Sequence, residues 1–230
     1  DKAGGGCGGS MRAMCIGLRF AGAQNRKDLI KTAVESGRIT HNHVNGFMGA
    51  VVAAAFTAYA IEGIPAIQWG HLLINELIPQ CDQYLQETKR DYTQIKMDMK
   101  NFEAKFLQYL KERNVVDGKS EPTFPDNYGV PERDIFYKKW SYNGWAGASG
   151  DDSVIIAYDA VLGAKDSWEE LVLRGVLHYG DNDSTGTIAC AWWGAMYGYP
   201  DSKYEKNWKG IEYEDRLLKQ ADLLYKLNQA

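Results

Sequence analysis

Residues 46–61 read GFMGAVVAAAFTAYAI, a segment in which alanine and other apolar residues fill almost every position. Placed on an α-helix, it leaves no continuous polar face. A helix that is apolar on most sides is normally buried at the centre of a bundle. We therefore expect residues 46–61 to form a central helix with other helices packed around it.

Outward from this segment, apolar residues recur at steps of three and four, which predicts further helices. We expect Gly37 to end the helix before the central one and Pro79 to end the helix after it. Because no Val/Ile/Thr alternation indicates a sheet, we predict an all-α domain spanning residues 1–230. The expected helices are residues 11–20, 26–36, 67–78, 154–163, 167–178, 181–197 and 211–227.

Residues 82–113 form a long amphipathic stretch with a predicted packing stripe. Residues 114–131 are a proline-containing connector, and residues 141–153 are a loop rich in glycine and small side chains. The members of the stripe are Tyr84, Leu85, Tyr92, Ile95, Met99, Phe102, Phe106 and Tyr109 or Leu110.

Composition excludes several classes of function. The formal net charge of −4 offers no broad basic field to a nucleic acid. No membrane span is expected, because residues 46–64 contain glycines, Thr57, Tyr59 and Glu62. The opening residues do not resemble a signal peptide. The four cysteines have no metal-finger spacing and are expected to be buried free thiols in a reducing, cytoplasmic setting.

The segment Gly180-Asp181-Asn182-Asp183-Ser184-Thr185 is the sharpest chemical signal. Asp181, Asp183 and Ser184 can direct three hard oxygen atoms to one place, and such atoms suit magnesium. The alternative is that they only cap the helix that follows. That helix is apolar, so its acidic start should lie in the interior or in a cleft, where buried carboxylates favour a cation.

Two glycine-containing loops and a histidine pair are weaker signals. Residues 4–12 offer backbone N–H groups to a phosphate, or form a flexible tail. Residues 142–152 combine aromatic and small side chains and could bind an adenosine, or form an ordinary connector. His41 and His43 could bind a metal, but capping and hydrogen bonding are favoured.

Together these segments resemble the ADP-ribosylglycohydrolase family, and most closely its ADP-ribosylarginine hydrolase branch. The resemblance rests on CGGSMRAMCIGLRF at 7–20, ESGRITH at 35–41, IAYDA at 156–160 and GDNDST at 180–185, in the order and spacing of the family. It implies a compact helical bundle around two magnesium ions. It also implies that Asp181, Asp183 and Ser184 are magnesium ligands.

The resemblance further implies a binding site for ADP-ribose. It places the phosphates on a loop comprising Gly6, Gly8, Gly9 and Ser10, and the adenosine beside Tyr142, Asn143, Gly144, Ala148 and Ser149. The family supplies the other half of its metal site from an Asp-Asp pair near its N-terminus, and nothing here matches that part. The only Asp-Asp pair, Asp151-Asp152, lies in a different family segment.

The implied function is magnesium-dependent removal of ADP-ribose from arginine residues of ADP-ribosylated proteins. No residue is predicted as the general base. The alternative is a catalytically silent member of the same fold that binds ADP-ribose or has a structural role. A third interpretation is a helical scaffold in which Asp181 and Asp183 only cap a helix. A separate N-terminal fragment or a larger assembly could complete the site.

Overall fold

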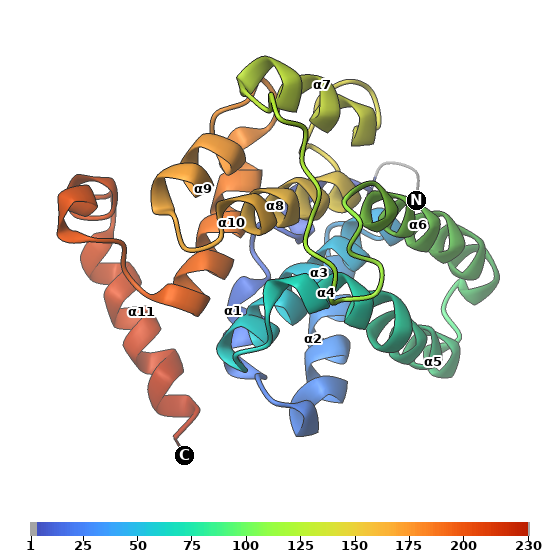
Figure 1. The fold of residues 1–230 in the computed structure, drawn as a ribbon. Helices are drawn as coiled ribbons and strands as arrows, with labels where there is room; N and C mark the ends of the chain where they lie inside the picture. The colour runs from blue at the N-terminus through green and yellow to red at the C-terminus, as the bar shows by residue number, and fades with distance from the viewer. Residues whose placement is uncertain (1–3, 230) are drawn as a thin grey trace.

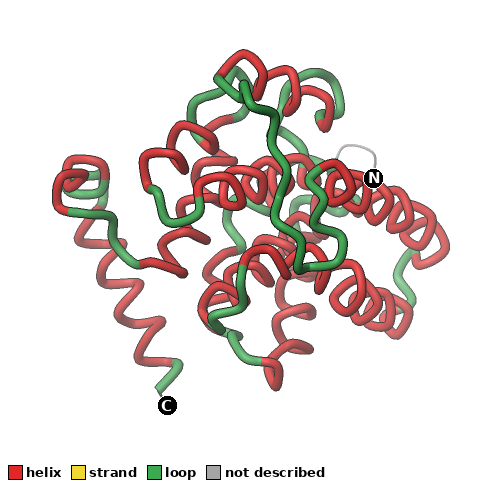
Figure 2. The backbone as a smooth tube through the Cα atoms, viewed as in Figure 1, coloured by secondary structure: helices red, strands yellow, loops and turns green. Residues whose placement is uncertain are grey.

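The structure is a computed structural model that describes residues 4–229. In this range it is all-α, as predicted, and it contains no strand, only an isolated β-bridge between Gly6 and Ser149 (Figure 2). The α-helices are α1 (Met14–Arg19), α2 (Arg26–Arg38), α3 (Val44–Ile61), α4 (Ala66–Leu72), α5 (Ile78–Thr88), α6 (Tyr92–Glu112), α7 (Val130–Trp140), α8 (Gly150–Ala164), α9 (Trp168–Gly175), α10 (Asn182–Tyr197) and α11 (Glu214–Leu227). Short elements are the 3-10 helices η1 (Cys7–Gly9), η2 (Ala23–Asn25) and η4 (Ser202–Asn207) and the π-helical turn η3 (Leu73–Leu77).

Helix α3 is the centre of the bundle, as its sequence predicts, and α1, α2, α8 and α10 pack around it (Figure 1). It is long and apolar enough to span a membrane by composition, but 89% of it is buried inside the fold. Small residues let its neighbours approach closely. A Cβ on Gly17 of α1 would lie 2.1 Å from the Ala54 carbonyl oxygen, and one on Gly49 would lie 2.4 Å from the Gly150 carbonyl oxygen.

An aromatic cluster fills the space beside α3. The Phe56 ring lies 5.2–5.3 Å from the rings of Trp69, Tyr158 and Trp192, measured between centroids. The Trp192 indole also donates a hydrogen bond to the Ala53 carbonyl at 3.0 Å. Since Trp192 belongs to α10, this contact fixes the helix that carries the candidate metal ligands against the core.

Three expected helix boundaries were wrong. Gly37 lies inside α2, where its missing side chain admits Phe47 of α3: a Cβ there would lie 2.8 Å from the Phe47 Cα. Pro79 does not end a helix but lies in the first turn of α5, directly after the π-helical turn η3, within a helical run that continues from Ala66 to Thr88. The 82–113 stretch is broken at Lys89 and Asp91, which adopt left-handed conformations, although most of its predicted stripe is buried.

Helix α7 was not predicted. Its sequence, VPERDIFYKKW, mixes charged residues with apolar ones and has no clear apolar face. It is held by tertiary contacts instead: Arg133 donates to the carbonyls of Tyr128 and Leu173, and Tyr137 donates to the carbonyl of Arg174. The prediction that all four thiols are buried was also wrong, because Cys15 on α1 is exposed and Cys7 and Cys190 are half-buried, which leaves Cys81 as the buried thiol.

Candidate active site

Three loops that the sequence singled out meet in space. The N–H of Cys7 donates to the Ala148 carbonyl at 3.0 Å, and the N–H of Gly150 donates to the Gly5 carbonyl at 2.9 Å. The N–H of Asp181 donates to the Ala146 carbonyl at 2.8 Å. The segment 146–150 therefore joins the glycine-rich loop on one side to the start of α10 on the other.

The start of α10 carries the three predicted magnesium ligands. Asp181 is half-buried at the N-cap position, Asp183 is exposed in the first turn, and the Ser184 side chain is buried. The Cys7 thiol donates to Asp181 Oδ2 at 3.0 Å and lies 3.4 Å from Ser184 Oγ. The acidic start of the helix is therefore in direct contact with the glycine-rich loop.

The two carboxylates influence each other's ionisation. Burial, together with a hydrogen bond to Asp183, raises the pKa of Asp181. That hydrogen bond lowers the pKa of Asp183, which is otherwise exposed to water. Two neighbouring carboxylates and the Ser184 hydroxyl form an oxygen-rich donor set, and a hard divalent cation suits such a set.

His178 contacts the residues on both sides of Asp181. The N–H of Gly180 donates to His178 Nδ1 at 3.1 Å, so Nε2 carries the ring proton and faces Thr185 Oγ1 at 2.8 Å. Burial lowers the pKa of His178 to about 4, and the ring is therefore neutral at pH 7. His178 thus bridges the turn before Asp181 to the first turn of α10.

The glycine-rich loop is only partly accessible. Gly6 and Gly8 are half-exposed, whereas Gly9 and Ser10 are buried. The Ser10 hydroxyl donates to the Cys7 carbonyl at 2.7 Å and lies 2.8 Å from Ser153 Oγ. Ser10 therefore joins the loop to α8 through contacts within the protein. The backbone around Gly6 and Gly8 is the part of the loop that remains open to a ligand.

Both histidines of the pair have structural contacts. His43 accepts a hydrogen bond from the N–H of Asn45 at 3.1 Å and so caps α3, as favoured from the sequence. His41 Nδ1 lies 2.7 Å from Thr40 Oγ1, and its ring packs against Gly8, where a Cβ would lie 2.7 Å from the ring carbon Cε1. Gly8 is thus required for the loop to lie on the His41 ring.

The predicted adenosine-binding residues divide into two groups. Tyr142, Asn143 and Gly144 lie in an exposed turn, and the Tyr142 side chain is 87% exposed. Ala148 and Ser149 are half-buried beside the glycine-rich loop, where Ser149 caps α8. Only the second group is in direct contact with the loop.

The ADP-ribosylglycohydrolase family model matches residues 1–230. The chain belongs to this family. It is 44% identical over 233 residues to the ADP-ribosylhydrolase ARH1 of Dictyostelium discoideum, a match that covers 93% of this chain and 58% of that protein. It is also 34% identical over 196 residues to the protein named "Putative ADP-ribosyl glycohydrolase L444" of Acanthamoeba polyphaga mimivirus, covering 84% of this chain and 38% of that protein. The chain thus spans less than two thirds of either relative's length.

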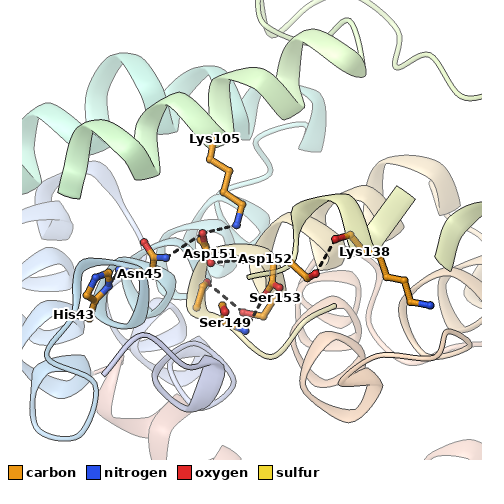
Figure 3. A network of polar contacts seen from close by, with 10 residues as sticks. His43, Asn45, Lys105, Lys138, Ser149, Asp151, Asp152 and Ser153 are labelled. Carbon is orange, nitrogen blue, oxygen red and sulfur yellow. Dashed lines mark hydrogen bonds and ion pairs between the residues drawn. The ribbon is translucent and has the colours of Figure 1, made fainter. Parts of the chain in front are cut away.

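A polar network around the buried Asp151 and Asp152 lies at the start of α8, next to the glycine-rich loop (Figure 3). The sequence did not predict this network. Lys105 Nζ contacts Asp151 Oδ2 at 2.6 Å, and the Asn45 amide donates to the same oxygen atom at 3.2 Å. The neighbouring Asp152 accepts from the N–H of Ser149 at 2.8 Å, while its Oδ2 has no hydrogen-bond partner. Burial, with the charge of Asp151, raises the pKa of Asp152 to about 7.

Two further residues at this candidate site were missed from the sequence. Cys7 lies within a quoted motif, but its contact with Asp181 spans 174 positions and depends on tertiary structure. His178 is three residues before Asp181, and only its polar character amid an apolar helix end could have suggested a role. Among residues 4–229 no group of three or more Asp, Glu, His or Cys side chains is placed to hold a metal ion.

Proposed function

We propose that this chain binds ADP-ribose and supplies one side of the magnesium site of a hydrolase that removes ADP-ribose from arginine residues of modified proteins. The observation that carries the proposal is the contact of Cys7 with both Asp181 and Ser184. It joins a loop suited to phosphate binding to an acidic helix start suited to a hard cation. Family membership and the two relatives support the same class of reaction.

The loops offer the groups that an ADP-ribose needs. Backbone around the half-exposed Gly6 and Gly8 can approach a diphosphate closely, because no side chain intervenes. The exposed rings of Tyr142 and Trp145 are available to stack against an adenine. In this arrangement the ribose that carries the arginine lies toward Asp181 and Asp183.

The donor set fits magnesium as a partial site. Two carboxylates and a hydroxyl are hard oxygen ligands, and the neighbouring Asp183 carboxylate adds to the burial that raises the pKa of Asp181. Bound divalent ions in such hydrolases orient substrate oxygens and a water molecule. Cleavage of the bond at the anomeric carbon passes through a transition state that resembles an oxocarbenium ion. The negative charge of Asp181 and Asp183 stabilises positive charge that develops nearby.

The proposal can be tested by a hydrolysis assay on arginine-ADP-ribosylated and serine-ADP-ribosylated peptides, with magnesium or with EDTA. We expect the chain alone to bind ADP-ribose and to turn over slowly, because its metal site is partial. Joined to the remaining part of the Dictyostelium relative, it should release ADP-ribose from arginine in a magnesium-dependent way. Turnover by the chain alone at the rate of the Dictyostelium protein would refute the partial-site proposal, and a preference for serine would refute the substrate.

Substitution of a proposed ligand provides the matched comparison. Asp183→Asn removes one charge from an exposed side chain and should leave the fold intact. Magnesium affinity should fall at least about tenfold, because even outer-shell changes cost about 10–100-fold. Asp126→Asn, an equally conservative change at an exposed residue between α6 and α7, should have no effect.

A second candidate function is binding of ADP-ribose without catalysis. The observation in its favour is that only two carboxylates gather at the start of α10 among the described residues. This function predicts ADP-ribose binding but no turnover, even when the chain is joined to the remaining part of the relative.

A further inference from the structure

A pocket lies at the opposite end of α10 from the candidate active site. Since α10 has 16 residues and rises 1.5 Å per residue, its two ends are about 24 Å apart. The pocket has a volume of about 290 Å³ and lies between the end of α10, the start of α9 and the short helix η4. Half of the residues that line it are aromatic, namely Trp168, Trp193, Tyr197, Tyr199 and Tyr204.

The aromatic rings of the pocket form a partly rigid wall. The Trp193 ring lies 5.3 Å from the Trp168 ring and 5.0 Å from the Tyr197 ring, measured between centroids. Trp193 is buried, and its indole donates a hydrogen bond to the Lys165 carbonyl at 3.1 Å, which fixes its orientation. Tyr197 and Tyr199 are 48% and 66% exposed. The accessible faces of such rings attract cations, because the π-system is negative above the ring.

Carboxylates add negative charge beside these rings. Asp166 and Asp201 line the same pocket, and both are exposed. Burial, and after it the charge of Asp166, raises the pKa of Tyr197, so the Asp166 carboxylate is near that phenol. At the edge of the pocket, Glu169 accepts a hydrogen bond from the Tyr204 hydroxyl at 3.2 Å. The pocket therefore combines aromatic faces with hydrogen-bond acceptors that carry negative charge.

One cation of the chain already contacts an aromatic ring of this pocket. The Lys203 ammonium lies 4.7 Å from the centroid of the Tyr204 ring. Contact with Tyr204, followed by the charges of Asp201 and Glu169, raises the pKa of Lys203. The surroundings therefore favour a positive charge. Among the residues that line the pocket, the carboxylates of Asp166 and Asp201 outnumber this one ammonium.

We propose that this pocket binds the guanidinium group of an arginine side chain. A planar guanidinium can stack on an aromatic ring and donate hydrogen bonds to a carboxylate at the same time, and the pocket offers both. A quaternary ammonium has no N–H to donate to Asp166 or Asp201, and a lysine ammonium is more strongly hydrated. Free arginine and an arginine within a polypeptide carry the same group. The inference concerns binding at the far end of α10 and does not depend on the proposed reaction.

Nuclear magnetic resonance titrations of this chain test the proposal. The ligands are free arginine, N-acetyl-arginine amide and the citrulline and trimethyl-lysine analogues of the amide. The indole N–H signal of Trp193, assigned with Trp193→Phe, reports on the pocket. We expect a saturable shift with both forms of arginine, and binding of the uncharged citrulline analogue at least about fivefold weaker. Equal affinity for the two forms would assign the side chain alone as the ligand, and a preference for the amide would assign a polypeptide.

Substitutions separate the aromatic contribution from the charge. Tyr199→Leu removes an exposed aromatic face and Asp201→Asn removes a charge, and each should weaken arginine binding at least about threefold. Because the Tyr199 ring also packs 4.6 Å from the Trp208 ring, Asp201→Asn decides the case in which Tyr199→Leu disturbs the loop. Lys203→Met should strengthen binding, since it removes a competing cation.

The matched controls are exposed residues outside the pocket. Tyr225→Leu on α11, at a 65% exposed position, and Asp126→Asn should leave arginine binding unchanged. Absence of a saturable shift with either form of arginine overturns the proposal, as does equal binding of the citrulline analogue. Tighter binding of the trimethyl-lysine analogue would assign a different cation and overturns it. Binding of arginine only by Lys203→Met would make Lys203 the pocket's own cation and equally overturns it.

Discussion

The thiol of Cys7 donates a hydrogen bond to Oδ2 of Asp181 at 3.0 Å, across 174 positions of sequence. This contact places a glycine-rich loop with accessible backbone beside an acidic helix start. Neither segment is specific alone, since glycine loops and capped helices are common. Their contact joins two separate sequence signals into one candidate site.

Replacement of Cys7 tests the contribution of this contact to stability. Cys7→Ala removes the donor to Asp181 and should lower the free energy of unfolding by about 0.5–1.5 kcal/mol, the usual net value of a hydrogen bond. Cys7→Ser can still donate to Asp181 and should retain more of the stability. Urea denaturation measures both, and equal losses in the two variants would mean that the hydrogen bond contributes nothing.

Because His178 is neutral in the fold, the stability of the protein should depend on pH below about pH 6.5. Its pKa of about 4 in the fold lies below the value of about 6.5 in unfolded chains, so the unfolded state binds the extra proton first. Its stabilisation is therefore complete above pH 6.5 and is lost as the pH falls toward 4, with a slope of up to about 1.4 kcal/mol per pH unit. His178→Gln, which cannot titrate, should flatten this part of the stability curve. An unchanged slope in the variant would contradict the assignment.

For Asp152, the free energy of unfolding should change with pH in the opposite direction. Its pKa of about 7 in the fold is above the value of about 3.9 in unfolded chains, so the folded state retains the proton longer. The stability that it contributes is present below pH 4 and is lost as the pH rises to about 7. Relative to Asp152→Asn, the wild-type chain should therefore become less stable across this range, and the control variant Asp126→Asn, which retains Asp152, should follow the wild type. Denaturation series at several pH values would reveal it.

The ion pair of Arg113 with Asp159 is buried and forms a network with Tyr109 and Tyr128. Arg113→Met leaves the Asp159 carboxylate without its cation in the core and should cost about 3–5 kcal/mol. Lys226→Met breaks an exposed pair with Asp222 on α11 and should cost less than about 1 kcal/mol. Similar losses in the two variants, measured by urea denaturation, would show that burial does not decide the strength of the pair.

Helices whose own hydrophobic pattern specifies them could be predicted from the sequence. The alanine-rich α3 and the stripe of α6 follow from hydrophobic pattern alone. Helix α7 could not be predicted, because its charged residues are stabilised by carbonyls distant in sequence. Pro79 and Gly37 are residue types that often end helices. Here Pro79 follows a π-helical turn inside a continuing helix, and Gly37 allows α2 to pack closely on α3.

The candidate site shows the same division. Asp181, Asp183 and Ser184 share one turn of helix, so their spacing alone predicts that they lie together. Ser10 is equally close to the glycines in sequence, yet its hydroxyl is buried against Ser153, a contact that spans 143 positions. Sequence spacing identifies which residues are neighbours along the chain, and only packing decides which of their groups remain open to a ligand.

Calorimetric titration of ADP-ribose into this chain tests the central claim most directly, in the presence of magnesium and again with EDTA, for the wild type and Asp181→Asn. We predict one binding site per chain, with tighter binding when magnesium is present, and loss of the magnesium effect in Asp181→Asn. Absence of binding, or binding of equal strength under all four conditions, would contradict a shared site formed by the glycine-rich loop and the start of α10.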